Sequence, residues 1–289
     1  MVECESVYID SMGEPLAARI YSSEVQAPAP VLILCHGFCG IQDVVLPLYA
    51  RAFVRAGFAV ITFDYRGFGE SKGERGRLRP ALQLEDIHAV IGWAARQAMF
   101  DSARIGLWGT SLGGAHVAVV AGQTTLVKCF VSQMAFADGE DLILGAMSRE
   151  EKSKFLSSLS KMQAKKKESG RELFVSPLKV LDDKSSHDFF DSHKADYPLL
   201  GTKIPFLTIQ EMLDYRPLDH LSSIKQPALI IAAELDQVNP PEQARKMYES
   251  LMCEKSFALI KGVGHYDLYE GRGFKEVIEK QIKWLHEYL

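Results

Sequence analysis

A short apolar run that ends in the pattern G-x-S-x-G constrains this chain more than any other feature of its sequence. The stretch covers residues 104–114, and the pattern within it is Gly109-Thr110-Ser111-Leu112-Gly113. A helical pattern follows directly, so we expect Ser111 where a strand turns sharply into a helix. Only glycine fits on either side of so cramped a turn, and the serine hydroxyl projects above the sheet edge. The helix N-terminus would stabilise negative charge at this hydroxyl.

Strand and helix patterns alternate on both sides of Ser111. Two strands at 5–9 and 16–21, joined by a turn, predict an antiparallel hairpin at the start of a sheet. Apolar runs predict five further strands, at residues 31–35, 58–63, 127–132, 228–233 and 256–260. With the strand before Ser111, the sequence predicts an α/β fold in which helices flank a mostly parallel eight-stranded sheet.

Residues 137–226 interrupt this alternation, and a structureless loop of about ninety residues is improbable in a compact domain. Helical spacing of apolar residues predicts a helical cap, or lid, inserted after the sixth strand. The core would then comprise residues 1–136 and 227–289. We expect the large apolar side chains of the insertion to form the cap's own core rather than to contact a substrate; these are Phe155, Phe174, Phe189, Phe190, Tyr197, Phe206 and Met212.

Composition limits the class of protein. A net charge of −4 gives no general attraction for nucleic acid, and no apolar run approaches the length of a membrane span. Five scattered cysteines lack the spacing of a zinc or redox site, so we expect no metal and no organic cofactor. The acidic N-terminus differs from a secretory signal, which predicts a cytoplasmic protein. The oligomeric state stays open, with a homodimer among the alternatives.

A serine becomes a nucleophile only beside a base, and the base needs an acid to orient it. Of the eight histidines, His265 is best placed, in a loop just after the last predicted strand. Asp236 follows the strand 228–233 and precedes His265 by one strand–helix–strand step. Glu234 and Asp267 are the rival acids. If these residues did not converge on Ser111, the serine would be incidental to a structural turn.

The order nucleophile, acid, histidine is that of the α/β-hydrolase superfamily, which the chain resembles over residues 30–136 and 227–289. His36-Gly37-Phe38 and the stretch from Asp64 to Ser71 add to the resemblance. It implies an oxyanion hole formed by the backbone N–H groups of Phe38 and Leu112. The stretch His265–Tyr269 is similar to the dienelactone-hydrolase-like and X-Pro-peptidase-like esterases. Phe38 stands where some of these peptidases use an oxyanion-hole tyrosine, which disfavours a peptidase of that type.

The resemblance implies a serine hydrolase that cleaves an ester or thioester of a small or medium-sized acyl substrate through an acyl-enzyme. An acyltransferase or a C–C bond hydrolase would use the same triad. Dehalogenases and epoxide hydrolases of this fold use an aspartate nucleophile, and position 111 is serine. A non-catalytic protein that binds a small ligand is the alternative of another class, and loss of a triad residue would favour it. The sequence identifies neither the acyl group nor the leaving group.

Overall fold

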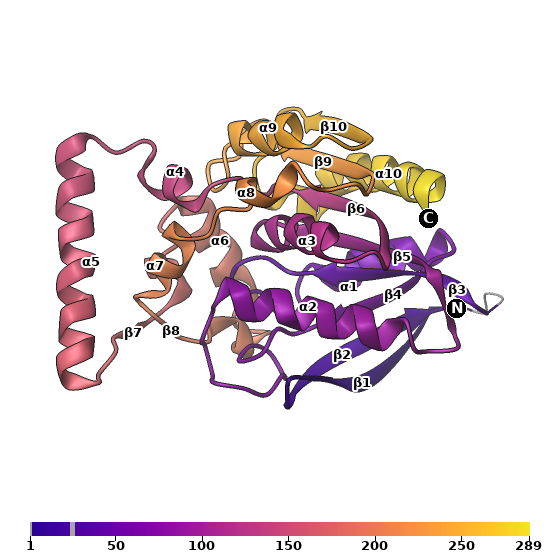
Figure 1. Ribbon diagram of the computed structural model, residues 1–289, viewed down its shortest axis with the longest axis horizontal. Coiled ribbons are helices and arrows are strands. Elements are labelled where there is room, and N and C mark those ends of the chain that lie inside the picture. Colours follow the sequence, from indigo (N-terminus) through magenta and orange to yellow (C-terminus); the bar gives the residue numbers. More distant parts are fainter. Residues whose placement is uncertain (1, 24–26) are drawn as a thin grey trace.

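The computed structural model describes residues 2–23 and 27–289, and a single eight-stranded sheet organises it (Figure 1). Its spatial order is β1-β2-β4-β3-β5-β6-β9-β10. β1 pairs antiparallel with β2, and β2 with β4, while all other neighbours are parallel. This confirms the predicted fold class. The strands are β1 (Glu3–Ser11), β2 (Glu14–Ser22), β3 (Ala29–Cys35), β4 (Ala59–Phe63), β5 (Phe100–Thr110), β6 (Val127–Gln133), β9 (Ala228–Ala233) and β10 (Lys255–Ile260).

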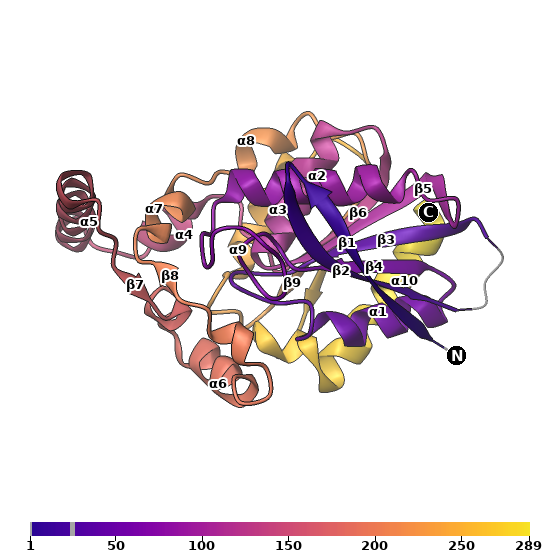
Figure 2. The same ribbon diagram turned by 90° about the horizontal axis from the view of Figure 1, so that it is seen from below.

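Helices cover both faces of the sheet (Figure 2). One face carries α1 (Leu46–Arg55) and α10 (Gly271–Tyr288), and the other carries α2 (Pro80–Ala94), α3 (Leu112–Gln123) and α9 (Pro241–Ser250). Successive side chains of a strand point to opposite faces, so the apolar strands feed two cores. In β5, for example, Leu107 packs on the α3 side and Trp108 on the α1 side.

Most of the chain between β6 and β9 lies at the end of the sheet opposite the two termini (Figure 1). Besides the helices, two residues of β7 pair antiparallel with two of β8, a small sheet that apolar spacing did not predict. The elements are α4 (Gly139–Leu144), α5 (Arg149–Ser169), β7 (Phe174–Val175), η1 (Pro177–Lys179), α6 (Lys184–His193), η2 (Pro198–Gly201), β8 (Ile204–Pro205), α7 (Thr208–Leu213) and α8 (Leu218–Leu221).

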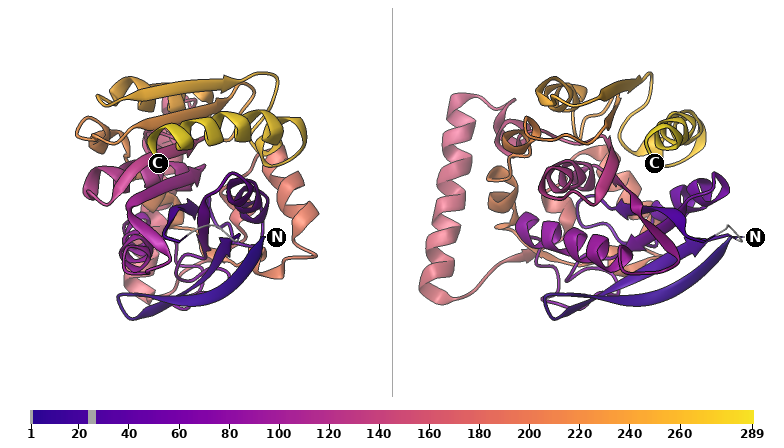
Figure 3. Two further views of the ribbon diagram at one scale, coloured as in Figure 1. Left: turned by 90° about the vertical axis from the view of Figure 1, so that its right-hand side faces the viewer. Right: turned by 45° about the vertical axis from the view of Figure 1, so that its right-hand side comes forward.

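Helix α5 stands apart from the body of the molecule (Figures 1 and 3). It is held as a helix by its ends, because Ser148 and Glu151 form a reciprocal capping box and Gly170 ends it in a left-handed conformation, at φ 69°. Leu159 is its one fully buried residue. Among the described residues, none of the helices has the length and apolar character needed to cross a bilayer.

Candidate active site

Ser111 occupies the turn between β5 and α3 in a strained conformation, with φ 55° and ψ −125°. Glycines allow the close approach of backbone that this turn requires. A Cβ atom on Gly113 would lie closer than 3.0 Å to the carbonyl oxygens of Cys35 and His36, and one on Gly109 would overlap the Gly113 carbonyl. The pattern around the serine is therefore the one that this turn needs.

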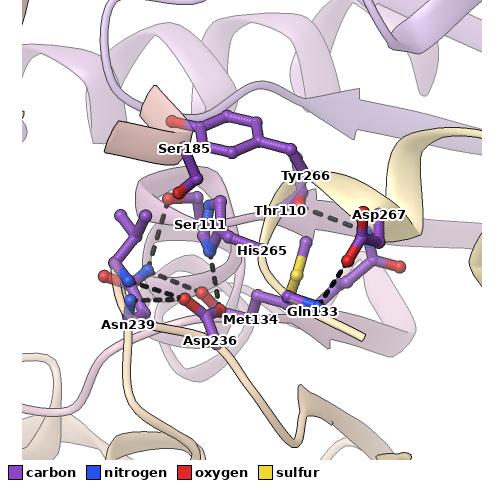
Figure 4. A network of polar contacts seen from close by, with 12 residues as sticks. Thr110, Ser111, Gln133, Met134, Ser185, Asp236, Asn239, His265, Tyr266 and Asp267 are labelled. Carbon is purple, nitrogen blue, oxygen red and sulfur yellow. Dashed lines mark hydrogen bonds and ion pairs between the residues drawn. The ribbon is translucent and has the colours of Figure 1, made fainter. Parts of the chain in front are cut away.

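His265 and Asp236 form a buried pair at the same sheet edge (Figure 4). His265 Nδ1 lies 2.7 Å from Asp236 Oδ2, and the two side chains are only 3% and 0% exposed. A carboxylate accepts hydrogen bonds, so Nδ1 carries the proton and Nε2 is left as the basic nitrogen. The second carboxylate oxygen accepts the N–H groups of Val238 at 2.9 Å and Asn239 at 2.8 Å, which fixes the aspartate.

The two rival acids lie elsewhere. Glu234 is exposed and accepts the N–H of Gly262 at 2.9 Å, while Asp267 accepts the N–H of Gly264 at 2.7 Å. Within residues 2–23 and 27–289, neither carboxylate is hydrogen-bonded to His265. The structure thus joins Asp236, and not its rivals, to the histidine.

The serine hydroxyl faces the histidine without a hydrogen bond to it in the part of the chain that the structure describes (Figure 4). Ser111 Oγ instead accepts from Asn239 Nδ2 at 3.3 Å. Ser111 and His265 line one cavity together. Catalytic hydrogen bonds in ligand-free enzymes are often long and tighten only when the substrate binds, so this geometry is compatible with proton transfer.

The two backbone N–H groups predicted to hold an oxyanion belong to Phe38 and Leu112, on two segments next to Ser111. Leu112 is the first residue of α3, so its N–H has no partner one turn earlier in the helix. Phe38 lies in the loop after β3, and this loop touches the serine, since a Cβ on Gly37 would be 3.1 Å from Ser111 Cβ. His36 is buried against Gly40 in the same loop, and burial lowers its pKa to about 4, so the ring is neutral at pH 7.

Two cavities meet at Ser111. The larger has a volume of about 530 Å³ and lies between the core and the elements α4, α5 and α7, with a mainly apolar lining. The smaller, of about 50 Å³, is bordered by His265, Tyr266 and Tyr269. Both reach the serine, because Ser111 lines each of them, and they share Phe38 and Val238 as well.

Several large apolar side chains of the insertion pack in apolar clusters and also line these cavities. Phe155, Phe206 and Met212 border the larger cavity, and Phe189 and Phe190 the smaller one. Phe174 is exposed, and Tyr197 packs against the same apolar cluster as Phe190.

Sequence reasoning also missed three polar residues at the site. Asn239 contacts both Ser111 and the Asp236 turn. Tyr269 shares a hydrogen bond with Thr110 at 3.1 Å, and the Tyr266 hydroxyl lies 2.8 Å from that of Ser186 on α6. Tyr266 and Tyr269 belong to the same loop as His265, and this position in the sequence could have indicated that they lie at the site. In the described ranges, no group of three histidine, cysteine or acidic side chains is arranged to hold a metal.

Comparison with known proteins places this chain in a family. Residues 30–272 match the family described as alpha/beta hydrolase fold, and the chain belongs to this family. A 31.7 kDa protein of Escherichia coli, from the traX-finO intergenic region, is 50% identical over 279 residues, which are 96% of this chain and 98% of that protein.

Two more distant proteins are similar over nearly the whole chain. The thiohydrolase aneE of Aspergillus aculeatus is 26% identical over 300 residues, covering 99% of this chain and 93% of its own. The structure of DcsB in complex with its substrate analogue superposes with a TM-score of 0.87 at 23% identity, covering 99% of both chains. At that identity the second likeness concerns the fold alone.

Proposed function

We propose that the protein is a serine hydrolase that cleaves an ester or thioester with an apolar acyl group. The observation that carries this proposal is the strained Ser111 at the meeting point of two cavities, beside the buried pair of His265 and Asp236. Membership of the hydrolase family and the likeness to a thiohydrolase support hydrolysis as the reaction class.

In the first half of the reaction, Ser111 Oγ attacks the acyl carbon while His265 Nε2 removes the hydroxyl proton. Asp236 stabilises the imidazolium that forms. The carbonyl oxygen becomes an oxyanion, which the N–H groups of Phe38 and Leu112 hold. One such donor typically changes the rate by about a hundred- to a thousandfold.

The tetrahedral intermediate then collapses. The bond from the acyl carbon to the leaving oxygen or sulfur breaks, and His265 gives its proton to the leaving group. Water attacks the acyl-enzyme, with His265 as the base, and the acid departs as Ser111 recovers its proton.

The larger cavity is the proposed site of the acyl group. Its volume of about 530 Å³ falls within the range of pockets that bind small molecules. In this scheme, residues 137–226 act as a cap over a catalytic core of residues 1–136 and 227–289.

The test is hydrolysis of p-nitrophenyl esters and acyl thioesters of increasing chain length by the wild type and by Ser111→Ala. We expect kcat/KM to fall by about a thousandfold or more in the variant, because the nucleophile is gone. Asp236→Asn should lose activity by about the same order, and Glu234→Gln serves as its matched control, with activity within about twofold of the wild type. Wild-type turnover by Ser111→Ala would overturn the proposal. Free acid as the main product, even with added alcohol or thiol acceptors, separates hydrolysis from acyl transfer.

A further inference from the structure

Asn239 contacts both the acid turn and the nucleophile turn (Figure 4). Its side chain is buried, and its backbone N–H donates to Asp236 Oδ1 at 2.8 Å. Its side-chain Nδ2 donates to the Met134 carbonyl at 2.6 Å and to Ser111 Oγ at 3.3 Å. Three segments distant in the sequence therefore meet on this residue.

The orientation of the Asn239 amide follows from its partners. A backbone carbonyl only accepts hydrogen bonds, so the NH₂ group, and not the amide oxygen, must face Met134. Met134 is itself held at the end of β6, because its N–H donates to the Ile231 carbonyl at 2.7 Å. With one amide hydrogen on that carbonyl, the second hydrogen is available to Ser111 Oγ.

We propose that Asn239 is a positioning residue for the Ser111 hydroxyl, an inference that rests on the proposed function. A hydroxyl has one hydrogen and two lone pairs. Accepting from Asn239 occupies one lone pair and leaves the hydrogen for His265 Nε2 and the other lone pair for the acyl carbon. As the proton leaves, the charge that develops on Oγ lies beside an N–H donor.

A purely architectural role for Asn239 makes a different prediction. The bond to Met134 alone would tie the acid turn to β6, and its loss would lower the stability of the fold without slowing the chemistry of molecules that remain folded. The first-order inactivation constant, kinact, distinguishes the two roles. It reports how fast bound inhibitor reacts in folded protein, whereas partial unfolding lowers only the amount of protein labelled.

The experiment is inactivation of the full chain by an alkyl fluorophosphonate, with kinact and KI determined separately for each variant. We expect Asn239→Ala to lower kinact by about tenfold with KI within about twofold, because one hydrogen bond to the reacting oxygen is lost. Asn239→Asp keeps the shape of the side chain without the donor, and we expect an equal or larger loss. Gln226→Ala is the matched control, since that amide donates to the Thr124 carbonyl at 2.9 Å, away from the serine.

The outcomes separate this inference from the proposed function. If the wild type is labelled at Ser111 and both Asn239 variants react with its kinact, the positioning role is wrong. A lower labelled fraction at unchanged kinact, with a lower melting temperature, also overturns it in favour of the architectural role. A wild type that does not react with the fluorophosphonate contradicts the proposed function itself.

Discussion

At the scale of single residues, His116 shows how burial fixes the charge of a side chain far from the reacting atoms. Its Nε2 lies 2.9 Å from Gln83 Oε1 and its Nδ1 lies 2.8 Å from the Tyr215 hydroxyl. A neutral ring with its hydrogen on Nε2 satisfies both partners. Burial lowers the pKa of His116 to about 3, against about 6.5 for a histidine in an unfolded chain.

This shift predicts a dependence of stability on pH. Between the two pKa values the unfolded state binds more protons, so the contribution of a neutral His116 is complete above about pH 6.5 and declines as the pH falls. At pH 5 the decline is about 2 kcal/mol. The free energy of unfolding in urea, taken as wild type minus His116→Gln, should therefore be lower at pH 5 than at pH 7.

The comparison with a variant is essential because another buried group acts in the opposite direction. Burial raises the pKa of Asp64 to about 6, so its protonation stabilises the fold as the pH falls below that value. Subtracting the two unfolding free energies cancels this contribution. A difference that stays constant from pH 5 to pH 7 would contradict the assignment of His116 as a neutral buried base.

At the scale of elements, the β5–α3 turn packs so closely on neighbouring backbone that Gly113 has no room for a side chain. In Gly113→Ala the new Cβ would overlap two carbonyl oxygens, one at the end of β3 and one in the loop that follows it. We expect the free energy of unfolding to drop by about 3 kcal/mol or more, as for other severe overpacking. Gly201→Ala is the control, because a Cβ there meets nothing within 4 Å, and its unfolding should change by less than about 0.5 kcal/mol. Equal urea midpoints for the two variants would refute this account.

The elements that the sequence predicts well are those with a strong local signal. Apolar runs identified the parallel strands, because strands buried on both faces leave few polar positions. Chain order then sufficed to bring Ser111, Asp236 and His265 together, since β5, β9 and β10 all end at one edge of the sheet.

What could not be predicted depends on contacts between elements distant in the sequence. The strands β7 and β8 have two residues each, too few for any periodicity. The helical spacing of Phe155 and Met212 identifies an apolar face, but does not say whether that face meets another helix or a cavity. Asn239 reaches Ser111 across 128 residues of chain, and no local pattern records such a contact.

At the scale of the whole molecule, the larger cavity belongs to neither part of the chain alone. Phe38 and Leu112 of the core form one wall, and Phe155 and Ile209 of the insertion form another. The size of the cavity is thus set by how the insertion packs on the strand ends. A change in the insertion should alter the choice of substrate without touching the proposed triad.

Ile209→Phe tests this dependence. The larger ring would project from α7 into the cavity and shorten the space for an acyl chain. We expect the optimum of kcat/KM in the p-nitrophenyl ester series to move to shorter chains, with acetyl ester hydrolysis within about threefold of the wild type. Leu156→Phe, on the exposed side of α5, is the matched control and should keep the wild-type profile. An unchanged profile in a stably folded Ile209→Phe would disprove the assignment of this cavity to the acyl group.

The left-handed φ of Ser111 lowers the stability of the folded chain at the residue that the proposed reaction needs. A residue with a Cβ in such a conformation typically costs about 1–3 kcal/mol. Alanine at this position would remove the hydroxyl and keep the strain, whereas glycine would remove both. Selection for thermal stability alone would therefore favour glycine at position 111. The chain is thus less stable than it would be with glycine at position 111, and the lost stability lies at the hydroxyl that the proposed reaction needs.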